Sequence, residues 1–155
     1  MPGPAESAAS ALGVPFRVLH HGPVRSAAEA ADAQGVEVHD LVKTIVVRRA
    51  ADDYVFVLVP GDRQISWPKL RAVLGVNRLS LPDAATAKDA TGYERGTITP
   101  FGSARPWPVI ADESTRGRTI NLGAGVHGTG LQVPADATVD ALDGTFADVT
   151  EPAPV

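Results

Sequence analysis

The sequence has no cysteine, which excludes disulfide bonds, thiolate metal sites and a cysteine nucleophile. Aromatic residues make up only 5% of the chain, and no apolar run is long enough to cross a bilayer. Residues 1–6 have neither the basic start nor the apolar segment of a signal peptide. We therefore expect no membrane partner and a cytoplasmic location.

The chain also has fewer basic than acidic residues, 14 against 18, which gives a net charge of −4 and a pI of about 5.5. Wrapping a nucleic-acid backbone requires many phosphate contacts, so DNA is not an expected partner. The net charge does not exclude a local basic patch that binds a short single-stranded end of a nucleic acid. For most of the basic residues a solvated surface is the simpler interpretation, and the candidates for a patch are Arg48, Arg49, Arg63, Lys69, Arg71, Arg78, Arg95, Arg105, Arg116 and Arg118.

The length of 155 residues, with 44% hydrophobic residues, fits one domain with a buried core. We expect this domain to span residues 1–150 and the proline-rich residues 151–155 to form a disordered tail. Short helices and strands intermix without a regular βαβ repeat, which favours an α+β fold with a mixed, curved sheet. The patterns predict helices over 6–12, 26–35, 66–74, 82–90 and 134–142, and strands over 16–20, 43–47, 54–59, 78–81, 107–112, 119–122, 131–133 and 145–149.

Lys43 is one of three lysines in the chain and lies in the apolar run Leu41–Val47. This run is typical of a mostly buried strand, in which Lys43 shares a face with Ile45 and Val47. Burying an unpaired ammonium is costly. Lys43 therefore either reaches solvent from the strand end or points into a polar pocket that holds a negative or carbonyl-bearing ligand.

The segment 91–102 contains three glycines and a proline, which indicates a shaped loop. Gly96 permits a positive φ or a close approach to a ligand, and Pro100 biases Thr99 toward an extended backbone. Such a loop can present N–H groups to an oxygen, with Tyr93 and Phe101 as walls of an apolar pocket. The alternative is a plain connection between a helix and a strand.

A glycine-rich segment, 123–130, matches the spacing of a dinucleotide-binding loop. No helical pattern follows it, and without a helix N-terminus the phosphate-binding mechanism of that motif is missing. We interpret the segment as a hairpin beside a ligand pocket.

The four histidines do not have a spacing suited to shared metal binding, and neither H-E-x-x-H nor G-x-S-x-G occurs. We predict no metal, no cofactor and no serine nucleophile, although spacing alone does not exclude a Ser-His-Asp triad.

Several segments, in their order along the chain, resemble the YbaK/ProX family of aminoacyl-tRNA deacylases, which is related to the editing domain of bacterial prolyl-tRNA synthetase. The resemblance covers about residues 14–149. It depends on Val42–Val47, on Val57–Asp62, on the G-x-x-x-P loop from Gly96 to Pro100 and on the glycine-containing segment that begins at Ile120.

The resemblance implies a barrel-like curved sheet around one pocket, and hydrolysis of the ester that joins a wrong amino acid to the tRNA 3′ end. Lys43 matches the essential lysine of the family, and Gly96 matches the first glycine of its loop. Gly123 stands where some members have a serine, so a hydroxyl is missing from the expected pocket. The remaining expected substrate contacts are Thr44, Tyr93, Thr99, Pro100, Phe101 and Gly125.

The resulting hypothesis is deacylation of mischarged tRNA in trans, with a small amino acid such as Ala or Cys removed and tRNA-Pro as the candidate tRNA. Lys43 would hold the ester carbonyl or a phosphate, and N–H groups near Gly96 would stabilise the oxyanion. The expected partners are the aminoacyl-tRNA 3′ end and an aminoacyl-tRNA synthetase. Two alternatives remain: a module that binds the tRNA end without cleaving it, and a hydrolase of another small acyl ester.

Overall fold

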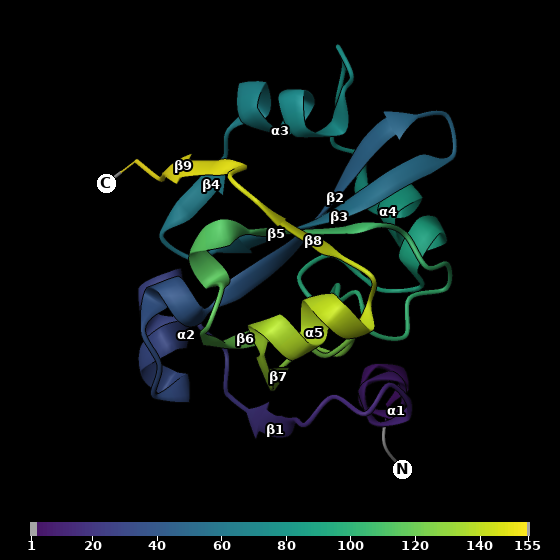
Figure 1. Cartoon of the computed structure of the whole chain (residues 1–155). Helices are drawn as coiled ribbons and strands as arrows, with labels where there is room; N and C mark the ends of the chain where they lie inside the picture. The colour runs from purple at the N-terminus through teal and green to yellow at the C-terminus, as the bar shows by residue number, and fades with distance from the viewer. Residues whose placement is uncertain (1–2, 155) are drawn as a thin grey trace.

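Three β-sheets and five α-helices form the part of the chain, residues 3–154, that the computed structural model describes (Figure 1). This arrangement confirms the predicted α+β class. The described strands do not close into a barrel, so the barrel-like shape implied by the resemblance is not found. The helices are α1 (Pro4–Ala11), α2 (Ala27–Gln34), α3 (Trp67–Leu74), α4 (Ala84–Thr91) and α5 (Ala135–Ala141), with 3₁₀ turns η1 (Val38–Asp40) and η2 (Glu113–Thr115).

The largest sheet is mixed and has the strand order β2 (Val42–Ala50), β3 (Asp53–Pro60), β5 (Val109–Asp112), β8 (Thr145–Ala147). The first two strands form the predicted antiparallel hairpin, and β3 and β5 then pair in parallel. Strand β3 lies inside the sheet and is apolar along almost its whole length, as expected for a strand that is covered on both faces.

The two faces of this sheet belong to two hydrophobic clusters, because side chains alternate along each strand. Val55, Val57 and Val59 pack with Leu70 of α3 on one face. Phe56 and Leu58 pack on the other face, with residues of α1, α5 and the second sheet. Figure 1 shows this division, with α3 on one side of the sheet and α1, α5 and β7 on the other.

The second sheet is antiparallel, with the order β1 (Arg17–His20), β7 (Thr129–Pro134), β6 (Thr119–Gly123). A single parallel bridge between Leu41 and Asn121 joins it to the start of β2. The free edge of β2 therefore runs beside β6, and this arrangement positions the candidate site.

Helix ends follow the sequence signals. The Ser26 hydroxyl accepts a hydrogen bond from the Glu29 N–H at 3.1 Å, which is one half of the predicted capping box. Gly35, Gly75 and Gly92 end α2, α3 and α4 in the left-handed conformation that glycine adopts without steric cost.

Two predictions about short segments are wrong. The expected strand 78–81 contributes only one bridge, from Ser80 to Arg48, because Pro82 follows at once and cannot donate to a ladder. Within the expected disordered tail, 151–155, Glu151 and Pro152 belong instead to β9 (Thr150–Pro152), which pairs with β4 (Arg63–Ile65); residue 155 lies outside the described residues. The Ala153 N–H also donates to the Asp62 carbonyl at 3.0 Å, so these backbone groups find partners that lie far away in sequence.

Candidate active site

A cavity of about 780 Å³ opens between the two larger sheets, beside the free edge of β2. Its walls are Leu41 and residues 42–46 of β2, the start of α4, the loop around Gly96, the end of α2 and the paired strands β6 and β7. The volume is in the range of pockets that hold small organic ligands. The cavity brings together four predicted site residues: Lys43, Thr44, Gly96 and Gly123.

The edge of β2 borders this cavity with unpaired backbone groups. Arg48 exchanges two backbone hydrogen bonds with Ser80, at 2.8 and 3.1 Å, so its N–H and C=O point outward from the sheet. Backbone groups alternate in direction along a strand, so Thr44 and Val46 also direct theirs outward. Between the bridges at Leu41 and Arg48, no described strand pairs with this edge. The Thr44 hydroxyl is also buried without a hydrogen-bond partner in the described chain.

Lys43 lies on the cavity wall with an exposed side chain. As predicted, Ile45 and Val47 on its face of the strand pack into a hydrophobic cluster. Lys43 stands near the strand start, where that cluster ends and the cavity begins. Its ammonium makes no ion pair with any residue from 3 to 154.

Charges on the cavity wall are mainly positive. Arg95 lies next to Gly96, is exposed and, like Lys43, makes no ion pair in the described part of the chain. The wall has one carboxylate, Asp83, which accepts a hydrogen bond from the Thr86 N–H at 2.8 Å at the start of α4. The backbone and side-chain hydrogen bonds of Thr86 lower the pKa of Asp83. The cavity therefore suits a ligand with negative charge or carbonyl oxygens.

Gly96 has a φ of +89°, a left-handed conformation that other residues adopt only with strain. There is open space around its Cα, since an added Cβ would meet only His127 Cε1, at 3.8 Å. The next residue, Thr97, donates its N–H to the Glu94 carbonyl at 3.0 Å and so closes the turn. The Gly96 N–H has no acceptor among the described residues, which leaves one backbone donor on the cavity wall.

Close packing against the Gly96 loop leaves no room for a side chain at Gly123. A Cβ at this position would lie 2.8 Å from the Ile98 carbonyl oxygen and 2.9 Å from that of Thr97. Both atoms belong to the backbone of the Gly96 loop, which cannot move aside as a flexible side chain does. The absence of a serine here is therefore a consequence of close contact between β6 and this loop.

Five predicted substrate contacts do not line the cavity: Tyr93, Thr99, Pro100, Phe101 and Gly125. The Tyr93 hydroxyl donates to the Phe101 carbonyl at 2.7 Å, and both side chains are buried in the core. Burial raises the pKa of the Tyr93 hydroxyl. Gly125 packs against the Tyr93 ring, where an added Cβ would lie 2.5 Å from Cε1. These residues pack in the core, on the side of the Gly96 loop that faces away from the cavity. The expectation that Tyr93 and Phe101 form pocket walls is therefore corrected.

The sequence interpretation missed an amide pair on the cavity wall. Asn121 of β6 is only 2% exposed, and its Nδ2 donates to Gln34 Oε1 at 2.7 Å. Gln34 is the last residue of α2, and both residues line the cavity. The sequence does contain a signal for this pair: Asn121 stands between Ile120 and Leu122, which are core residues, and a buried amide requires a hydrogen-bond partner.

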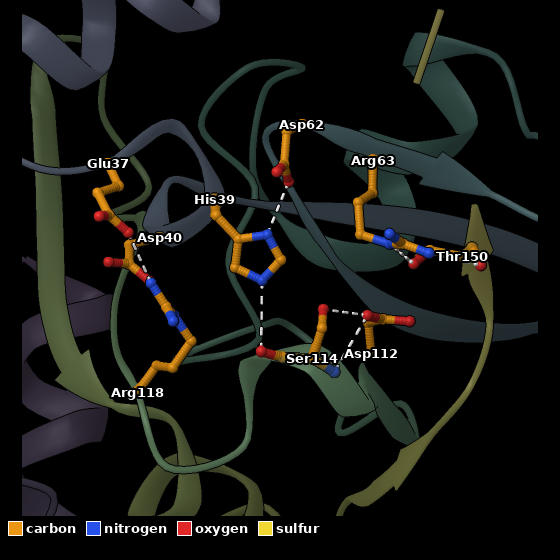
Figure 2. Close-up of polar contacts among 9 residues, drawn as sticks. All are labelled: Glu37, His39, Asp40, Asp62, Arg63, Asp112, Ser114, Arg118 and Thr150. Carbon is orange, nitrogen blue, oxygen red and sulfur yellow. Dashed lines mark hydrogen bonds and ion pairs between the residues drawn. The ribbon is translucent and has the colours of Figure 1, made fainter. Parts of the chain in front are cut away.

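A histidine, an aspartate and a serine do meet, outside this cavity, but not as a nucleophilic triad (Figure 2). His39 Nδ1 lies 2.8 Å from Asp62 Oδ1, and Nε2 lies 3.3 Å from the backbone oxygen of Ser114. The Ser114 hydroxyl instead donates to Asp112. His39 therefore links η1, the β3–β4 turn and η2, and the serine is not activated.

These observations define the class of the protein: an α+β domain whose cavity offers a lysine, an arginine and free backbone donors and acceptors to a carbonyl-bearing or anionic ligand. No helix between residues 3 and 154 has the length and apolar character to traverse a lipid bilayer.

The chain belongs to the aminoacyl-tRNA editing domain family, whose model matches residues 21–141. Editing is the hydrolysis of the ester between an amino acid and tRNA, and the protein is a hydrolase of this class.

Comparisons with individual proteins agree with this assignment. The chain is 26% identical, over 81% of its length and 77% of the relative's, to the Enterococcus faecalis protein named "Putative Cys-tRNA(Pro)/Cys-tRNA(Cys) deacylase EbsC". It is 34% identical to the proline–tRNA ligase of Thermosipho melanesiensis, over 64% of the chain but only 18% of the ligase. The crystal structure of hypothetical protein APE2540 superimposes with a TM-score of 0.87 at 27% identity, covering 96% of this chain and all of that one.

Proposed function

We propose that the protein removes a small amino acid from mischarged tRNA in trans and that Lys43 and Gly96 form the reaction centre. The observation that carries this proposal is that the Lys43 side chain and the Gly96 backbone, 53 residues apart in sequence, lie on the walls of one cavity. The cavity is large enough for an aminoacyl group with part of the terminal adenosine.

The proposed reaction is attack by water on the ester carbonyl carbon. The carbonyl becomes an oxyanion, the bond to the ribose oxygen breaks, and the ribose hydroxyl and the free amino acid leave. The Lys43 ammonium has three N–H donors and forms no ion pair within residues 3–154, so it can hold the carbonyl oxygen or a nearby phosphate. The unpaired Gly96 N–H is the second donor for the developing negative charge.

No protein nucleophile is needed for this reaction, because the ester is already activated. Positioning of the ester and stabilisation of charge supply the rate enhancement. Removal of one oxyanion donor in other enzymes costs about 3 kcal/mol, which corresponds to a rate loss of about 10²-fold. We expect a loss of at least this size when Lys43 is removed.

The amino acid removed is proposed to be small. The E. faecalis relative is named for the deacylation of Cys-tRNA(Pro), and other relatives are proline–tRNA ligases. A site of limited size that admits only small side chains is the usual basis of a second sieve. Cysteine or alanine on tRNA-Pro is therefore the proposed substrate, with a synthetase as a proposed partner.

A second hollow, of about 630 Å³, supports an RNA partner. Arg48, Arg49, Arg71 and Arg78 line it, and of these only Arg49 forms an ion pair in the described chain, with Asp53 at 2.9 Å. The Arg48–Ser80 bridge separates this hollow from the active-site cavity. Lys43 and Arg48 are five residues apart, or about 17 Å along a strand. A run of about five stacked nucleotides covers the same distance. When the 3′ end lies at Lys43, phosphates about five nucleotides away can therefore contact these arginines.

The test is release of amino acid from a panel of tRNAs charged with Ala, Cys, Ser or Pro. Wild type is expected to release Cys or Ala from tRNA-Pro and to spare Pro-tRNA-Pro. Lys43→Ala is expected to reduce this rate at least about 10²-fold without a change in melting temperature. Lys69→Ala is the matched control, because Lys69 pairs with Asp148 and does not line the cavity.

Full activity of Lys43→Ala would refute the assigned role. Binding of tRNA without release of any amino acid would support a non-catalytic binding module. Equal activity on a free amino-acid ester and on aminoacyl-tRNA would indicate a general esterase.

A further inference from the structure

A chain of three side-chain amides crosses from β7 to the active-site cavity. Gln132 Nε2 donates to Asn121 Oδ1 at 3.2 Å, and Asn121 Nδ2 donates to Gln34 Oε1 at 2.7 Å. Gln132 and Asn121 stand opposite each other in the β6–β7 ladder, so the pairing of the strands fixes the first link. The chain ends at Gln34, on the cavity wall.

The direction of these hydrogen bonds determines what Gln34 presents. Its carbonyl oxygen faces Asn121, so its NH₂ group points the opposite way. No residue between 3 and 154 accepts a hydrogen bond from this NH₂ group. Each amide that accepts a hydrogen bond also becomes a better donor, so the Gln34 N–H is strengthened by the two links behind it.

Asn121 holds this arrangement firmly. It is 2% exposed and lies between core residues of β6, and both ends of its amide are hydrogen-bonded. Rotating the Gln34 amide alone by half a turn, with Asn121 and Gln132 unchanged, would place two NH₂ groups against each other. A buried donor without an acceptor costs about 1–3 kcal/mol, so as long as Asn121 donates to Gln34 the Gln34 NH₂ group is directed away from Asn121, on the cavity side.

The position of Gln34 relative to the reaction centre indicates its ligand. Asn121 and Gly123 are two residues apart on β6, or about 7 Å. Asn121 also bridges to Leu41, two residues before Lys43. A group that contacts Gln34 therefore lies several ångströms from an ester held by Lys43 and Gly96. In an aminoacyl-tRNA end, neutral acceptors at this separation belong to the terminal adenosine.

We propose that Gln34 donates a hydrogen bond to an acceptor atom of the terminal adenosine, a base nitrogen or a ribose oxygen, and that Asn121 fixes its orientation. Gln34 is thus a substrate-positioning residue on the wall of the cavity. This inference rests on the proposed function, since it assumes that the tRNA 3′ end enters the cavity.

The first experiment measures binding of an RNA oligonucleotide ending in CCA by calorimetry, and it requires no catalysis. Gln34→Met keeps the length of the side chain and removes the amide. We expect about fivefold weaker binding, the effect of one neutral hydrogen bond. Gln64→Met is the matched control, because Gln64 is exposed on β4 and pairs with Glu151 away from the cavity. Equal affinity of Gln34→Met and wild type would overturn the proposal.

The second experiment compares deacylation of aminoacyl-tRNA with hydrolysis of the amino-acid methyl ester, which has no adenosine. We expect Gln34→Met to raise KM about fivefold for the tRNA substrate and to leave the methyl ester unaffected. Asn121→Asp replaces the Nδ2 donor by an oxygen, so Gln34 should turn its carbonyl toward the cavity and produce the same defect. An equal loss on both substrates would show a general structural effect and contradict the proposal. A protein without hydrolase activity would refute the proposed function, and the binding experiment would still decide the role of Gln34.

Discussion

Replacement of Gly123 by serine tests whether packing against the Gly96 loop excludes a side chain there. A Cβ at this position would lie 2.8 and 2.9 Å from two backbone oxygens, several tenths of an ångström closer than an ordinary contact. The loop or β6 has to move by about that distance, and overpacking of this kind typically costs about 1–3 kcal/mol. For a chain of this length, the melting temperature should fall by about 3–10 °C.

The same shift should affect catalysis, because the displaced carbonyls of Thr97 and Ile98 follow directly after Gly96. A donor that moves by half an ångström no longer fits the oxyanion, and we expect kcat to fall about tenfold or more. The assay combines thermal unfolding with the deacylation rate on the best substrate of the tRNA panel.

Gly22→Ser is the matched control for this substitution. An added Cβ at Gly22 meets nothing within 4 Å, and its φ is not positive. This variant should keep the wild-type melting temperature and rate. If Gly123→Ser also kept both, the packing argument would be refuted. Higher activity would show instead that a hydroxyl at this position, which the family resemblance implies, assists the reaction.

Three further predictions concern a buried carboxylate, the loop at Gly96 and the arginine-lined hollow. Asp112 is buried, which opposes its ionisation, but hydrogen bonds from Ser114, Thr150 and two backbone N–H groups outweigh this and lower its pKa; Figure 2 shows the contacts with Ser114. Its stabilising effect is complete above the unfolded pKa of about 4 and is lost as the pH falls through the lower folded value. Asp112→Asn should therefore melt below wild type at pH 7, with a smaller difference below pH 4 by calorimetry. Tyr93→Phe leaves the buried Phe101 carbonyl without its donor and should cost about 1–2 kcal/mol in urea unfolding, whereas unchanged stability would contradict that hydrogen bond. Arg71→Ala combined with Arg78→Ala should weaken tRNA binding and reduce the slope of log affinity against log salt by about 1–2, whereas Arg17→Ala, on exposed β1, should change neither strongly.

The amino-acid sequence by itself determined most of the local structure. Helix ends at Ser26 and Gly35 and the hairpin around Asp52 depend on dihedral preferences and on hydrogen bonds between near neighbours, which short segments already specify. It also singled out Lys43 and Gly96, because a lysine in an apolar strand and a glycine before a shaped turn are unusual within their own segments. The family resemblance assigned both to one site.

Only the tertiary structure decided how these segments meet. Tyr93 and Phe101 pack inward, Gly123 contacts the loop at Gly96, and Gln34 meets Asn121, which is 87 residues further along the chain. Each of these contacts joins elements whose separate patterns are compatible with several pairings. The choice among the pairings is made when the two sheets close on a common core, where side-chain volume and buried hydrogen bonds have to be satisfied together.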